Sequence, residues 1–71
     1  SSQAQAGQVL DIACDQLIRL DFVAAGSVLN WAAEMQNQGY SLRFTQLHQL
    51  VAVFFHIIGI PEHAKVQATI A

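Results

Sequence analysis

Three short stretches of the chain alternate apolar and polar residues, which is the pattern of a β-strand with one buried face. They predict strands over the ranges Val9–Cys14, Ser41–Thr45 and Ala64–Ile70. In the third range every second residue from Lys65 onward is polar, so one face is wetter than the other. This asymmetry is typical of a strand near the edge of a sheet.

Two longer stretches between the strands repeat apolar residues at helical spacing. They predict helices over Phe22–Gln38 and Gln46–Ile58. The residues expected to face the core are Ala25, Val28, Leu29 and Ala32, flanked by Phe22, Ala33 and Met35, in the first helix, and Leu47, Leu50, Val51, Phe54 and Ile58 in the second. Val23 instead falls in the polar arc of the first helix, where it should face solvent or a partner.

The residues at the ends of both helices favour these boundaries. Asp21 is expected to cap the first helix, because its carboxylate can accept a hydrogen bond from the first backbone N–H groups. Thr45 is expected to cap the second helix in the same way. Gly39 and Gly59 follow the two helices, at the position where a left-handed residue commonly ends a helix.

The elements therefore follow one another in the order β-α-β-α-β with short links. This order favours parallel strands joined by right-handed crossovers. It predicts a small α/β layer with a mainly parallel sheet and both helices packed on one face, which leaves the opposite face bare. Residues 1–8 are small and polar, and we interpret them as a flexible arm before one domain over residues 9–71.

The composition is unusually apolar for so short a chain. Of the 71 residues, 54% are hydrophobic and 11% are charged, whereas charged residues make up roughly 25% of an ordinary soluble domain. A small domain also keeps much of its surface in water. We therefore expect another segment, a second copy or a partner to cover some of this apolar surface. The bare face of the predicted sheet fits this apolar excess. A homo-oligomer or a strand-swapped dimer is the expected form, since the sheet has uncapped edges.

The charge pattern and the apolar runs narrow the classes of partner. The net charge is −2, and the three basic residues Arg19, Arg43 and Lys65 are scattered, which argues against binding to nucleic acid. The most apolar run, Leu50–Ile60, is shorter than the roughly 20 residues of a membrane span, so no direct membrane insertion is expected. The chain start lacks the features of a signal peptide. The lone Cys14 excludes an internal disulfide, and a cytoplasmic location is expected.

The polar residues give no pattern of a catalytic or metal site. Asp11 and Asp15 have no second polar group expected within reach for acid–base chemistry. His48 and His56 would stand about 12 Å apart along the predicted helix, which is too far to share a metal ion. His63 completes no cluster with them. We expect no cofactor and no metal, and we predict that the protein is not an enzyme.

Three stretches carry a pattern that extends over most of the chain: VLDIACDQLIRLDFVAAGSVLNW, QGYSLRFTQLHQLVAVFFHIIGI and PEHAKVQ. The positions in step with it are Val9–Ile12, Asp21, Gly26, Leu29, Gly39, Leu42 and Gly59–Ile60. Over roughly residues 9–70 the chain resembles a STAS domain, the fold of bacterial anti-sigma factor antagonists. The family usually begins with one or two further strands, so this chain resembles a STAS domain truncated at its N-terminus.

The resemblance implies a non-catalytic protein–protein interaction module that docks through the start of its first helix. The contacts it suggests are Asp21, Phe22, Val23, Ser27 and Trp31. In phosphoregulated members the residue after the aspartate is the phosphorylated serine or threonine. Phe22 stands at that position and cannot accept a phosphate, so no phosphorylation is expected there and the usual control looks lost.

Simpler roles remain open for the same residues. Asp21 can be a helix cap alone, and Phe22 can pack on the sheet beside an incidentally exposed Val23. Trp31 can pack at the edge of the core. Cys14 is most simply a small buried apolar residue.

Three partner classes follow from the resemblance and the composition. The first is an anti-sigma factor-like kinase. The second is the ATPase of a lipid-transport ABC complex, in which a STAS-like chain serves as an accessory subunit. The third is a small ligand or lipid held in the apolar space between helices and sheet.

Overall fold

The computed structural model of the protein describes residues 7–70, except for the side chains of residues 69 and 70. Its elements are β1 (Val9–Ala13), α1 (Phe22–Asn37), β2 (Ser41–His48), α2 (Gln49–Ile58), a 3-10 turn η1 (Ile60–Glu62) and β3 (Ala64–Ile70). The predicted α/β class and the β-α-β-α-β order are confirmed. Of the arm expected over residues 1–8, residues 1–6 lie outside the described part. Gly7 and Gln8 form backbone hydrogen bonds with Gly39 and Ser41.

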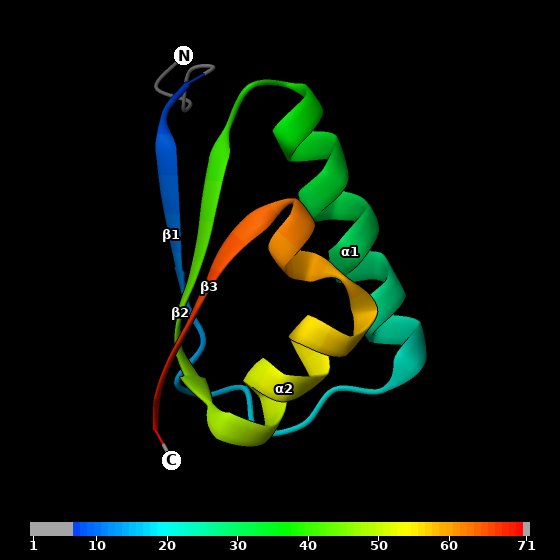
Figure 1. The fold of residues 1–71 in the computed structure, drawn as a ribbon, viewed down its shortest axis with the longest axis vertical. Coiled ribbons are helices and arrows are strands. Elements are labelled where there is room, and N and C mark those ends of the chain that lie inside the picture. Colours follow the sequence, from blue (N-terminus) through cyan, green and yellow to red (C-terminus); the bar gives the residue numbers. More distant parts are fainter. Residues whose placement is uncertain (1–6, 71) are drawn as a thin grey trace.

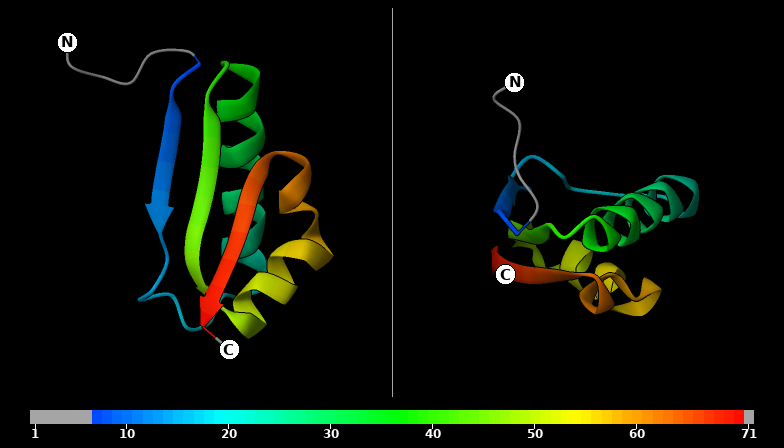
Figure 2. Two further views of the ribbon diagram at one scale, coloured as in Figure 1. Left: turned by 60° about the vertical axis from the view of Figure 1, so that its left-hand side comes forward. Right: turned by 90° about the horizontal axis from the view of Figure 1, so that it is seen from above.

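The three strands form one parallel sheet in the order β1-β2-β3. Both helices lie on the same face of this sheet, as the view from above in Figure 2 shows. Two crossovers of the same hand between neighbouring strands place their helices on one side, so this arrangement follows from the strand order. The second face of the sheet carries no helix (Figure 1).

The core lies between the sheet and the two helices. Its largest fully buried side chains are Leu42, Leu47, Phe55 and Ile60. Phe44 of β2 meets Phe55 of α2 edge to face, with ring centroids 5.3 Å apart. In α1, Ala25 and Ala32 are fully buried and allow the helix to approach the sheet closely. The predicted core face of α1 is therefore confirmed, with the exception of Phe22, which is exposed.

Strand β2 is longer than the sequence pattern predicted. It continues to His48, so α2 begins at Gln49 rather than at Gln46. An irregularity between Phe44 and Leu47, with a positive φ of 59° at Gln46, shifts the alternation by one residue and keeps Leu47 facing the core. The predicted cap at Thr45 is wrong, because this residue lies within the strand.

The late start of α2 also changes which side of the helix is buried. The predicted core arc included Leu50, but Leu50 is 82% exposed. Of the residues predicted to face the core, Val51 is buried, and Phe54 and Ile58 are half-buried. Ala52 and Phe55, which were not in the predicted arc, are buried as well. The prediction had treated Leu47 as helical and had taken it as the first residue of the apolar stripe. Leu47 belongs to the strand instead, and within α2 the residues that face the core are Val51 and Phe55.

The predicted helix ends are confirmed at three positions. The Asp21 carboxylate accepts a hydrogen bond of 2.8 Å from the backbone N–H of Ala24, as an N-cap does. Gly39 and Gly59 follow the two helices with φ values of 95° and 91°. This left-handed conformation is one that glycine adopts without steric penalty.

Candidate functional site

The start of α1 presents two apolar side chains to solvent. Asp21 fixes the first turn through its cap, and the next two residues, Phe22 and Val23, follow directly. Phe22 is 76% exposed and Val23 is 82% exposed. The prediction that Phe22 flanks the core is therefore wrong, whereas the outward position predicted for Val23 is confirmed. Phe22 is the first residue of α1, and its ring contacts that of Phe54 in α2.

Helix α2 carries a second apolar stripe on its outer side. The stripe consists of Leu50, Val53, Phe54 and Ile57, which repeat at the i, i+3, i+4, i+7 spacing of one helix face. Leu50 and Ile57 are largely exposed, Val53 is exposed and Phe54 is half-buried. The helix contains no Asp, Glu, Lys or Arg. A helix that is apolar on both sides normally has both sides covered.

The two exposed regions are continuous. Phe22 meets Phe54 edge to face, with ring centroids 5.2 Å apart. Beside this pair, a hollow of about 280 Å³ is lined by Ile18, Arg19, Leu20, Leu50, Val51 and Phe54. The segment before α1 and the outer side of α2 therefore form one surface. We name it the apolar patch and define it as Ile18, Phe22, Leu50, Val53, Phe54 and Ile57.

Two charged residues stand at the margin of the apolar patch: Arg19, and Asp21, which directly precedes Phe22 and caps α1. Arg19 lines the hollow and is exposed. Among residues 7–70, Arg19 forms no ion pair. The ion pair found in this range joins Arg43 and Asp11. The patch is thus an apolar surface with a positive charge beside the hollow and a negative charge at the start of α1.

The predicted contact residues do not all lie together. Val23 and Ser27 are four residues apart on the outward side of α1, next to Phe22, and both are exposed. Trp31 is nine residues from Phe22, about half a turn away around the helix. Its ring lies 6.5 Å from that of Phe44, edge to face. Trp31 therefore packs over β2 and lies on the other flank of α1 from the patch.

Sequence reasoning missed the part of the patch that α2 and the preceding loop contribute. Leu50 had been assigned to the core, and Ile18 was expected to anchor the connection before α1 to the core, but both are largely exposed. Val53 and Ile57 had been given no role at the surface. The signal was present in the stretch LVAVFFHII, which has more apolar residues than one buried helix face can use.

The open face of the sheet is mostly polar, unlike the apolar patch. It carries the exposed ion pair of Asp11 and Arg43, with 2.9 Å between Oδ1 and Nε, beside Lys65 of β3. Exposed pairs of this kind contribute about 0–1 kcal/mol to stability. The apolar excess in the composition had been linked to this bare face. That interpretation is wrong, because the exposed large side chains gather mainly on the patch.

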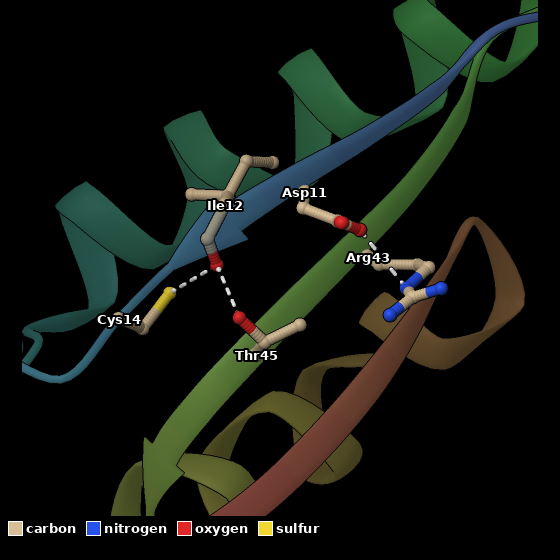
Figure 3. Close-up of polar contacts among 5 residues, drawn as sticks. All are labelled: Asp11, Ile12, Cys14, Arg43 and Thr45. Atoms are coloured by element: carbon tan, nitrogen blue, oxygen red, sulfur yellow. Dashed lines mark hydrogen bonds and ion pairs between the residues drawn. The ribbon is translucent and has the colours of Figure 1, made fainter.

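Cys14 is buried at the end of β1 (Figure 3). The carbonyl oxygen of Ile12 accepts from the Cys14 thiol and from the Thr45 hydroxyl, each at 3.5 Å. Burial, and secondly the negative charge of Asp15, raise the pKa of the Cys14 thiol above its usual value. The thiol is therefore protonated at neutral pH, which is the unreactive form.

Two of the three histidines join neighbouring segments, and His56 forms a hydrogen bond within its own helix. His48 forms a hydrogen bond of 2.9 Å between Nε2 and the Asp15 carbonyl, and His56 donates from Nδ1 to the Ala52 carbonyl at 2.8 Å. His63 donates from Nδ1 to Gln36 Oε1 at 2.7 Å. Within residues 7–70, no three His, Cys, Asp or Glu side chains lie close enough together to hold a metal ion.

A second hollow of about 260 Å³ lies where β2 and β3 begin. Polar residues line much of it, including Ser41, Glu62 and Lys65. At its margin the Gln36 amide donates to the Glu62 carbonyl at 3.3 Å, which fastens the end of α1 to the turn before β3. This hollow therefore lies beside a polar contact between the end of α1 and the turn before β3.

Neither helix in the described range has the length and apolarity that crossing a membrane requires. Comparison of the chain with protein-family profiles, curated proteins and solved structures finds no match.

Proposed function

We propose that this chain is a non-catalytic protein–protein interaction module of the STAS type, which docks a separate partner protein through the apolar patch and the adjoining start of α1. The observation that carries the proposal is the exposure of Phe22 at the first turn of α1, in edge contact with Phe54 of α2. Large aromatic side chains at the centre of an interface supply a large share of its binding energy.

The patch also supports a statement about the chemistry of the partner. Its centre is uncharged, so a partner that places a charge there would lose hydration without gaining a counter-charge. Arg19 at the margin favours a carboxylate on the facing surface. The expected partner therefore offers an apolar surface, such as one face of an amphipathic helix, with an Asp or Glu at its border.

The partner class that the STAS resemblance favours is a kinase-like anti-sigma factor in the cytoplasm. The ATPase of a lipid-transport complex is the other class, and the identity of the captured protein distinguishes the two. A ligand-carrier role has less support from the geometry. The hollow beside Phe54 is open and slightly smaller than the roughly 300 Å³ at which ligand pockets begin.

Affinity capture followed by calorimetry with the identified protein tests the proposal. Phe22→Asp should weaken binding about thirtyfold or more, because it removes the central ring. An acidic residue at a helix start suits the helix dipole, so the variant should stay folded. Asn37→Asp, at the exposed far end of α1, is the matched control and should bind normally.

A second variant tests the chemistry of the margin. Arg19→Glu should weaken binding, and the difference from the unchanged protein should shrink as salt is added. A captured protein that binds the Phe22→Asp variant and the Asn37→Asp control equally well would show that it docks elsewhere. The proposed site would then be refuted.

A further inference from the structure

The size of the apolar patch sets the starting point for a second inference, which rests on the proposed function. Patches on a lone protein rarely exceed roughly 300–600 Å². Ile18, Phe22, Leu50 and Ile57 are each at least two-thirds exposed, and one aromatic side chain alone can bury roughly 150–250 Å². Covering the whole patch would therefore bury a large part of the roughly 800 Å² that each partner buries in a standard interface. The patch is therefore large enough to be one half of a stable interface.

The charge pattern of α2 permits a second copy to meet this surface. A two-fold contact places each patch against its own equivalent, so any charge at the centre would face a like charge. Helix α2 contains no Asp, Glu, Lys or Arg, and so no such repulsion arises. The i, i+3, i+4, i+7 spacing of Leu50, Val53, Phe54 and Ile57 is also the spacing at which two helices pack face to face.

The shape of the patch also permits two copies to fit together. Ile57 projects from α2, where 72% of it is exposed. Three and seven residues earlier in α2, Phe54 and Leu50 border the hollow beside Ile18. Each copy therefore carries both a projecting side chain and a recess, which an isologous pair can match twice.

We propose that a second copy of this chain covers the apolar patch when the partner protein is absent, so that self-association controls access to the docking site. Partner binding then requires the pair to separate, because Phe22 and Phe54 cannot contact both surfaces at once.

Sedimentation velocity of the full chain, from low micromolar to millimolar concentration, is the first measurement. The chain should pass from monomer to dimer as its concentration rises. Ile57→Lys should weaken the dimer by about tenfold or more, since it places a charge at the centre of the contact. Asn37→Lys adds the same charge at an exposed helix position outside the patch and should leave the dimer unchanged.

A soluble paramagnetic probe tests whether the dimer hides the patch. In methyl NMR spectra, relaxation of Ile18, Leu50 and Ile57 by the probe should fall as the dimer forms. Val9, which is half exposed on the open sheet face, is the control and should relax equally in both states. A dimer in which the patch methyl groups stay accessible, as pairing through sheet edges or swapped strands would give, overturns the proposal. A monomer at every concentration overturns it too.

Neither measurement uses a partner protein, so the two proposals can fail separately. A chain that dimerises through the patch but binds no partner refutes the docking function. A chain that remains monomeric and still binds a partner through Phe22 refutes only the control by self-association.

Discussion

Phe22 of α1 and Phe54 of α2 meet edge to face with their ring centroids 5.2 Å apart, although 32 positions separate them in the sequence. Phe54 supports the exposed ring of Phe22 from one side and leaves most of its surface free. A side chain held in this way loses less rotational freedom when a partner binds. The contact therefore prepares Phe22 for docking as well as joining the two helices.

This relationship predicts an energetic coupling between the two rings. A double-mutant cycle with Phe22→Leu and Phe54→Leu should give a coupling of about 0.5–1.5 kcal/mol in the free energy of unfolding, the usual range for aromatic pairs. Urea denaturation of the four proteins measures it. Strictly additive effects would mean that the rings do not interact, and that the start of α1 is not held against α2.

The rotation of α2 predicts that substitutions at two of its residues change the free energy of unfolding by very different amounts. Phe55→Ala should lower the free energy of unfolding by about 3–5 kcal/mol, because the ring is fully buried. Leu50→Ala should change it by less than about 0.5 kcal/mol, because Leu50 is exposed. Phe55→Leu, measured by the same denaturation, should fall between them if the alanine variant does not fold. If Leu50→Ala were instead the more destabilising substitution, the buried face of α2 would be the one that the sequence pattern predicted.

The positions of most elements could be predicted from the sequence, because they depend on local signals. Asp21 before the first helix and the glycines at positions 39 and 59 set boundaries that the structure confirms. Alternation along β1 likewise gave the buried face of that strand. These features require information from a few neighbouring residues only.

The rotation of α2 and the position of the patch could not be predicted in the same way. Leu47 reads equally well as the last apolar residue of a strand or the first of a helix, and the irregular residue Gln46 decides between them. Since α2 is apolar on both sides, periodicity alone does not tell which side is buried. Only packing against β2 and β3 leaves Leu50 and Ile57 outside.

The buried thiol predicts a dependence of stability on pH. The pKa of Cys14 is raised in the folded chain, first by burial and then by Asp15. Above about pH 8.5 the unfolded chain therefore loses its thiol proton before the folded chain does. The contribution of Cys14 should be fully present below that pH and should be lost as pH rises towards the folded pKa.

Denaturation of the unchanged protein and of Cys14→Ala across this range measures that contribution. The free energy of unfolding should fall more steeply with pH in the unchanged protein than in the variant. Equal slopes would show that the thiol ionises as readily in the folded chain as in the unfolded one.

The residue at position 22 predicts the response to a protein kinase. Incubated with an anti-sigma factor-like kinase and ATP, the unchanged protein should remain unlabelled, because Phe22 offers no hydroxyl. Phe22→Ser supplies a hydroxyl directly after the Asp21 cap and is the matched variant for the same assay. Mass spectrometry locates any phosphate. Stoichiometric phosphate on Ser27 of the unchanged protein would show that phosphoryl control survives one turn further along α1.

Site-specific photo-crosslinking at position 22 tests the docking surface most directly. A photoreactive phenylalanine analogue replaces Phe22 in the full chain inside cells, and the same analogue at position 37 is the control. The account predicts a covalent adduct with one identified partner protein from position 22 and none from position 37. Adducts of equal yield at both positions, or none at position 22, would contradict it.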